Sequence, residues 1–228
     1  MPDVVQVGPL FLKTQWLVGI GALLVGYVVI GDRLKVAGYR DERVIQTIEN
    51  GAIIALVVWK FSGVIFDPAI IRGNPMALLY FTGGVQGVWL AAAVAVLYFY
   101  LRARAQRVPI WVYADLITVG FLAASLVYHL LDLFWYHQMV RVNALQVATA
   151  LILAILAFRS GTEIGDPVRL NQMVLWFSLA QIAAAFLNPL RQRYWLGFSR
   201  DQLLYAGLAA LALGVEWATE RRRLSRNA

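Results

Sequence analysis

The chain has 228 residues, of which 61% are hydrophobic and only 14% are charged. Soluble domains carry roughly 25% charged residues, so this composition indicates an integral membrane protein. Long apolar runs favour spanning helices over a barrel, whose strands alternate apolar and polar residues. The absence of cysteine excludes disulfides, thiol catalysis and thiolate metal sites. The basic residues behind the net charge of +7 lie in short loops, so topology explains them and nucleic acid is not predicted as a partner.

Seven apolar segments approach the roughly 17 to 25 residues that a spanning helix needs. In chain order they lie near residues 11–30, 46–66, 82–101, 109–134, 142–158, 170–188 and 201–218. Turn-forming residues mark the breaks between them, at Gly31, Asp67-Pro68, Asn74-Pro75, Gly161, Asp166-Pro167 and Asn188-Pro189. We therefore predict an all-α integral membrane protein in which residues 1–228 form a single domain of seven transmembrane helices.

Lys and Arg are concentrated in alternate loops. The richer set comprises residues 31–45, 102–107 and 159–169 and the tail ERRRLSRN, whereas the intervening loops and the N-terminal segment hold fewer basic residues. Basic residues favour the cytoplasmic side of a membrane. The pattern predicts an N-terminus outside and a C-terminus in the cytoplasm, which agrees with an odd number of spans.

Four of the ionisable residues inside the predicted spans are candidates for a functional role. Lys60 lies late in the second span, where its long stem can carry the ammonium to the outer interface. Asp115 lies just inside the fourth span, where a carboxylate compensates the positive end of the helix dipole. His129 and Asp132 are three residues apart and share one helical face near the outer end of that span.

The His129–Asp132 pair has two interpretations. A carboxylate at this spacing can orient an imidazole and raise its basicity, as a general base requires. Alternatively, both side chains face lipid headgroups at the interface. The two histidines, His129 and His137, are eight apart on one helix, which argues against a haem held between helices. No cofactor and no metal site are predicted.

A basic cluster follows the sixth span on the predicted outer side, where the charge rule does not require it. Its members are Arg191, Arg193 and Arg200, close in sequence to Tyr194 and Trp195. Guanidinium groups bind phosphate through paired hydrogen bonds, and the nearest phosphates are those of lipid headgroups. Either a specific headgroup site or non-specific headgroup contact accounts for the cluster.

Several stretches resemble the prolipoprotein diacylglyceryl transferases (the Lgt family). In chain order they read "VGPLFLKTQWLVGIGALLVGY", "WKFSGVIFDP", "GNPMALLYFTGGVQGVW", "VPIWVYADLITVGFLAA" and "FLNPLRQRYWLGFSRDQLLYAGLAALALG". The likeness covers nearly the whole chain. It implies an Lgt-like fold of seven helices in the bacterial cytoplasmic (inner) membrane. It also implies a phosphatidylglycerol-like phospholipid, and a lipoprotein precursor or other membrane-anchored peptide, as partners.

The sequence departs from the family pattern at the positions that carry the family's catalytic and lipid-binding residues. The family's third span opens with His-Gly-Gly-x-x-Gly, whereas this loop reads Thr82-Gly83-Gly84-Val85-Gln86-Gly87. Threonine needs help to act as a base near neutral pH. Further replacements relative to the family are Gln15 for tyrosine, Lys60 for arginine, His129 for arginine, Asp132 for asparagine, Ala184 for arginine and Asn188 for glutamate; Arg191 is retained.

The resemblance implies a reaction in which a precursor thiol attacks a glycerol carbon of phosphatidylglycerol and glycerol phosphate leaves. Lysine and neutral histidine do not replace a bidentate guanidinium. We therefore favour a non-catalytic or repurposed scaffold that binds phospholipid or membrane peptide, with Gln15, Lys60, Arg191 and Arg193 as lipid-binding residues. An active diacylglyceryl transferase with a site rebuilt from His129, Asp132, Lys60 and Arg191 is the alternative. A second alternative is an unrelated seven-helix sensor or transporter.

Overall fold

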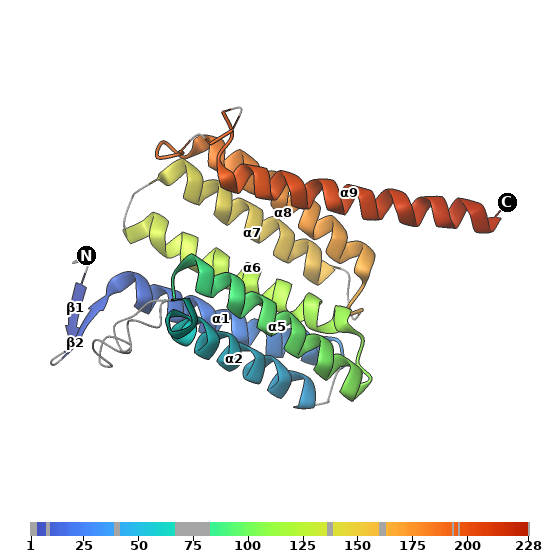
Figure 1. Cartoon of the computed structure of the whole chain (residues 1–228), viewed down its shortest axis with the longest axis horizontal. Coiled ribbons are helices and arrows are strands. Elements are labelled where there is room, and N and C mark those ends of the chain that lie inside the picture. The colour runs from blue at the N-terminus through green and yellow to red at the C-terminus, as the bar shows by residue number, and fades with distance from the viewer. Residues whose placement is uncertain are drawn as a thin grey trace. The chain divides into compact units, whose positions relative to one another are not determined.

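The computed structural model describes residues 4–7, 10–38, 42–66, 83–135, 139–159, 163–192, 194–195 and 197–227. Within these ranges a short β-hairpin precedes seven α-helices (Figure 1). The elements are β1 (Val4–Val7), β2 (Leu10–Lys13), α1 (Thr14–Val36), α2 (Glu42–Phe66), α5 (Gly84–Gln106), α6 (Ile110–Trp135), α7 (Val140–Arg159), α8 (Pro167–Leu187) and α9 (Arg200–Asn227). The chain divides into two compact units. The two-helix unit, named for the two complete helices described in it, comprises residues 40–113, and the larger unit comprises residues 1–39 with 114–228.

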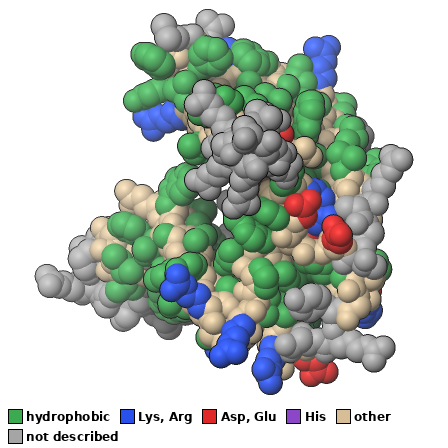
Figure 2. Space-filling view, turned by 90° about the vertical axis from the view of Figure 1, so that its right-hand side faces the viewer, with side chains coloured by type: hydrophobic (Ala, Val, Ile, Leu, Met, Phe, Trp, Pro, Cys, Tyr) green, Lys and Arg blue, Asp and Glu red, His purple; other side chains and the backbone are tan. Residues whose placement is uncertain are grey.

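The surface of the helices is apolar. Six described helices, all except α9, are long and apolar enough, by length and composition, to cross a membrane. Hydrophobic side chains cover much of the face seen in Figure 2, and side chains such as Leu23, Val85 and Leu211 are more than two-thirds exposed. These features indicate a multi-pass, essentially all-α membrane protein. The seventh span, the orientation and the single domain stay predictions.

The helix bounds lie close to the predicted spans. The start of α8 shows why. Asp166 caps the helix by accepting a hydrogen bond from the backbone N–H of Val168 at 2.9 Å, and Pro167 occupies the first turn. At the other end of α8, Asn188 is the C-cap, and Pro189 follows it. Turn chemistry in the sequence thus located both ends of this helix.

Two expectations about the first span are wrong. The helix begins at Thr14 rather than near residue 11, because residues 10–13 pair with residues 4–7 as an antiparallel ladder. The valine-rich strand Val4–Val7 suits this pairing, since β-branched residues pack well on a pleated surface. The helix also continues through Gly31 to Val36. Ile30 and Leu34 are buried on either side of this glycine, so tertiary packing outweighs its weak helix propensity.

Small residues bring helices of the larger unit together. A Cβ added to Gly26 on α1 would lie 2.5 Å from the carbonyl oxygen of Gly120 on α6. Membrane helices approach closely where side chains are small. Next to Gly120, Val119 packs in a buried cluster with Ala157 of α7 and Met173 of α8. The helices α7 and α8, and α8 and α9, lie side by side (Figure 1).

The two-helix unit is built from α2 and α5, which also lie side by side (Figure 1). Gly51 on α2 leaves room for the ring of Phe99 on α5, which a Cβ would strike. Two hydrogen bonds in series link α2, α5 and the start of α6 within this unit. Tyr113 donates to Gln106 at 2.5 Å, and the Gln106 amide donates to the hydroxyl of Thr47 at 2.9 Å.

Candidate functional site

The predicted site residues fall in both units. Thr82 and Arg193 lie outside the described residues, and Gln15 is described only as part of the α1 backbone. Lys60, which is half-buried, belongs to the two-helix unit, whereas Arg191 belongs to the larger unit. Each is described within its own unit. A site that joins Lys60 to Arg191 therefore stays a prediction.

The glycine-rich loop packs one helix against another. Ser62 on α2 is fully buried, and its hydroxyl donates to the carbonyl of Trp59 at 2.8 Å and lies 3.2 Å from that of Gly83. A Cβ on Gly83 would clash with the Trp59 carbonyl oxygen, and one on Gly87 would clash with the Ser62 hydroxyl. Gly84 has a φ of +59°, a conformation that favours glycine. Gly83 and Gly87 therefore allow the close approach to α2, and Gly84 allows the turn.

Among the described residues of this loop, Val85 and Gln86 carry the side chains, and both are exposed. Neither titrates. The local chemistry is that of a packing contact between α2 and α5, and the Ser62 hydroxyl at this contact is engaged by backbone carbonyls.

His129 and Asp132 are joined by a third residue, Asn143 of α7. The Asn143 amide nitrogen donates to the Asp132 carboxylate at 2.6 Å, and its oxygen lies 3.0 Å from Nδ1 of His129. Asn143 is 5% exposed, while His129 and Asp132 are half-buried. The sequence placed the histidine and the carboxylate on one face but did not provide the bridge between them.

This bridge selects one tautomer of the imidazole. Because the Asn143 nitrogen faces Asp132, its oxygen faces His129 and accepts only from an N–H. Nδ1 of His129 therefore carries the proton, and in the neutral ring Nε2 holds the basic lone pair. The arrangement can present one hydrogen-bond acceptor or one base. The signal in the sequence was Asn143 itself, an amide inside an apolar segment.

Arg191 lies beside a polar cavity of about 440 Å³ where α8 turns into α9. The lining includes Asn188, Arg191, Tyr194, Ser199, Arg200 and Asp201. Two arginines outnumber the one carboxylate, and the N-terminus of α9 adds a partial positive charge. The cavity is therefore suited to an anion.

A capping box shapes this turn. Ser199 accepts a hydrogen bond from the Gln202 backbone at 3.2 Å, and the Gln202 side chain accepts one from the Ser199 backbone at 2.9 Å. Gln202 is 1% exposed, and its carbonyl oxygen also lies 3.3 Å from a guanidinium nitrogen of Arg191. One buried glutamine thus starts α9 and holds Arg191 in place.

Aromatic rings support both cavity arginines. The Arg191 guanidinium lies 4.8 Å from the ring centroid of Phe186, and that of Arg200 lies 4.6 Å from the ring of Tyr194. Stacking fixes a guanidinium plane and leaves its N–H edges for a ligand. Tyr194 and Trp195 are more than 60% exposed, as aromatic residues at a membrane interface usually are.

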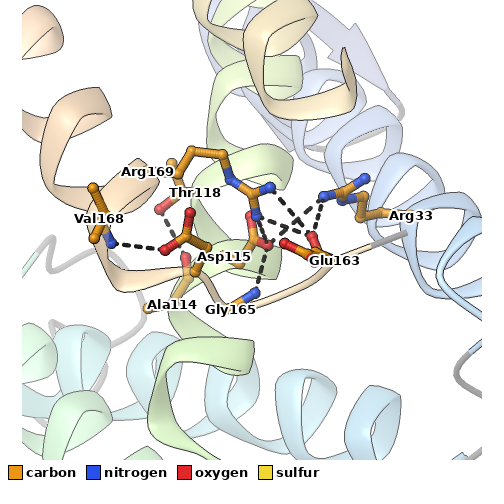
Figure 3. A network of polar contacts seen from close by, with 9 residues as sticks. Arg33, Ala114, Asp115, Thr118, Glu163, Gly165, Val168 and Arg169 are labelled. Atoms are coloured by element: carbon orange, nitrogen blue, oxygen red, sulfur yellow. Dashed lines mark hydrogen bonds and ion pairs between the residues drawn. The ribbon is translucent and has the colours of Figure 1, made fainter. Parts of the chain in front are cut away.

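The larger unit holds a second charged cluster among α1, α6 and the segment that leads into α8 (Figure 3). Arg33 and Asp115 are fully buried. Asp115 accepts hydrogen bonds from Arg169 at 2.5 Å and from the Gly165 backbone at 2.9 Å, and Arg33 lies 3.8 Å from the same oxygen. Both guanidiniums also donate to the carbonyl of Glu163, at 3.0 and 3.2 Å.

Sequence reasoning attributed Arg33 and Arg169 to topology and Asp115 to the helix dipole. The structure shows instead that the three charges form one ion-pair network that ties separate helices together. The available signal was that two loop arginines and a carboxylate inside a span all fall at the same predicted membrane face.

No protein-family model matches this sequence, and no curated protein matches it. The resemblance to the Lgt family accordingly rests on the order and spacing of the quoted motifs.

Proposed function

We propose that the chain binds anionic phospholipid in the bacterial inner membrane, as a divergent Lgt-like scaffold without transferase activity. One observation carries the proposal: the arginine-lined cavity at the α8–α9 turn. Arg191 is also the residue retained at the matched positions in the resemblance. The ligand class is a phosphatidylglycerol-like lipid, and a membrane-anchored peptide such as a lipoprotein precursor is the second partner.

The chemistry of the cavity favours a lipid with a net negative charge. A phosphodiester accepts hydrogen bonds from Arg191 and Arg200, and Asp201 repels a second carboxylate or phosphate. Phosphatidylcholine adds a cation that two arginines disfavour. We expect preference for phosphatidylglycerol over phosphatidylcholine, together with weakening at high salt, because the cavity opens to the interface.

The test is native mass spectrometry of the protein released from nanodiscs that contain both lipids. The double variant Arg191→Gln with Arg200→Gln should lose roughly 10- to 100-fold in phosphatidylglycerol affinity, since a hydrogen bond to a charged group contributes about 1.5–3 kcal/mol. Arg141→Gln is the matched control, because Arg141 is exposed in the same unit outside the cavity. Equal lipid retention by the double variant and the control would contradict the proposal.

Lys60 requires a separate variant, because the resemblance places it at the matched lipid site. Lys60→Met alone should lower phosphatidylglycerol binding if the two units jointly hold the lipid. Added to Arg191→Gln, it should then strip bound phosphatidylglycerol while the fold survives in detergent. Unchanged binding by Lys60→Met would restrict the site to the α8–α9 turn.

An active phosphatidylglycerol-dependent transferase is the second candidate. The specific observation in its favour is the Asp132–Asn143–His129 chain, which leaves Nε2 of His129 as a base. The test is growth of a bacterial strain depleted of its own diacylglyceryl transferase. Rescue by the unaltered protein, lost on His129→Ala, would establish the transferase and reject the scaffold. Failure to rescue, at confirmed expression, supports the scaffold.

A further inference from the structure

A second cavity of about 370 Å³ lies within the larger unit, among α6, α7, α8 and α9. Its lining includes Thr118, Phe121, Leu153, Phe177, Ser178 and Leu208, and the remaining lining side chains are all apolar. Ser178 is the twelfth residue of α8, so its Cα lies about 16 Å from the helix start at 1.5 Å per residue. The cavity is therefore near the middle of this predicted span.

The two hydroxyls in this lining have different surroundings. The Thr118 hydroxyl donates to the Ala114 carbonyl one turn earlier, at 2.7 Å. Ser178 is 1% exposed, and its hydroxyl has no hydrogen-bond partner among the described residues. A buried polar group without a partner is costly, and each such group in a native structure requires an explanation. Here the unsatisfied donor borders an apolar space large enough for a small ligand.

We propose that this cavity binds an apolar, membrane-dissolved molecule whose carbonyl oxygen accepts a hydrogen bond from Ser178. The rest of the ligand is hydrocarbon or ring, because the other lining side chains are apolar apart from Thr118, whose hydroxyl already donates to a backbone carbonyl. Phe121 and Phe177 lie edge to face with centroids 5.7 Å apart, a wall against which a flat ring packs well. The site is separate from the arginine-lined cavity and does not depend on the proposed headgroup function.

The predicted depth of Ser178 in the membrane restricts which molecules can supply the carbonyl. The hydrocarbon core is about 30 Å thick, so phospholipid ester carbonyls lie roughly 15 Å from its centre. A phospholipid held by its headgroup at the interface does not bring an ester to Ser178. A quinone-type ring meets the requirement because it moves within the core, and so does a neutral diacylglycerol. The carbonyl chemistry is common to both, and the experiment distinguishes them.

The test uses the full-length protein in nanodiscs with radiolabelled decyl-benzoquinone, corrected for partition into empty discs. Unlabelled competitors are a long-chain ketone and the alkane of equal length, which differ only in the carbonyl. The ketone should displace the label roughly 3- to 10-fold better than the alkane, the difference expected for one neutral hydrogen bond. Ser178→Ala should abolish that difference.

Two further variants control for the fold and for the cavity. Thr118→Val lines the same space but removes a hydroxyl that is already engaged, so the preference for ketone should persist. Val174→Phe should fill the cavity and lower the amount of labelled quinone that the protein binds. Ser178→Ala should also unfold at the same or a higher temperature than the unaltered protein, because it removes an unsatisfied polar group.

Equal displacement by ketone and alkane from the unaltered protein would overturn the proposal. A lower unfolding temperature for Ser178→Ala would also overturn it, because the hydroxyl would then be bonded within the protein. Diacylglycerol that displaces the label as well as unlabelled quinone does would support the carbonyl site and assign it to neutral lipid. Displacement by the ketone and by unlabelled quinone, but not by diacylglycerol, would assign it to a quinone-type ring.

Discussion

Asp115 gives the sharpest test of how the larger unit is held together. In Asp115→Ala, the carboxylate that accepts from Arg169 and from the Gly165 backbone is lost, and Arg33 loses its nearest anion. Removing one partner of a buried ion pair typically costs about 3–5 kcal/mol, because the other charge stays buried. The Arg169 side chain is 12% exposed and can relax toward solvent, so we expect the lower end of that range.

The assay is reversible unfolding in mixed micelles, followed by circular dichroism. Glu163→Gln is the matched control. It alters an exposed side chain of a residue whose backbone carbonyl accepts from both arginines, so it should change the unfolding free energy by less than about 0.5 kcal/mol. Replacing Asp115, Arg33 and Arg169 together by apolar residues should cost less than Asp115→Ala alone, since no charge is left unpaired. A cost below about 1 kcal/mol for Asp115→Ala would refute the reasoning.

Three other outcomes are expected. Gly83→Val should destabilise the protein by about 1–3 kcal/mol in the same assay, because the side chain meets a backbone carbonyl, whereas Gly21→Ala should be neutral in open space. Asn143→Leu should convert His129 from one neutral tautomer to a mixture, visible in its ring ¹⁵N shifts, while fold and helicity persist. Thr82→Ala should leave lipid binding within a few-fold, and a complete loss would show that Thr82 has a chemical role.

The helices were predictable because a membrane imposes length and apolarity on each span. Turn residues such as Asp166 and Asn188 then placed helix ends accurately. The hairpin was not predictable in the same way, since Leu10–Lys13 is as apolar as the start of a span and its strand partner is a tertiary feature. The break predicted at Gly31 was wrong for a different reason. Glycine disfavours a helix only weakly, and the packing of buried neighbours can outweigh that preference.

The candidate site was less predictable because its contacts join different helices. His129 and Asp132 share a face by spacing alone, but Asn143 bonds to both from another helix, which periodicity does not reveal. Nothing in the sequence distinguishes Ser178 from other small residues in the apolar spans. The Gly83–Gly87 spacing is the exception. Small residues let membrane helices approach closely, and both of these glycines pack against α2.

The larger unit carries arginines in two clusters, and their surroundings separate structural from ligand-binding roles. Arg33 and Arg169 are directed at Asp115 and at the Glu163 carbonyl, and Arg33 has no exposed surface, so their donors serve to join helices. Arg191 and Arg200 stack on aromatic rings and line an open polar cavity. Counting basic residues treats all four alike, as determinants of orientation. Burial and donor geometry distinguish them, and both support the proposal that the α8–α9 turn is an anion site.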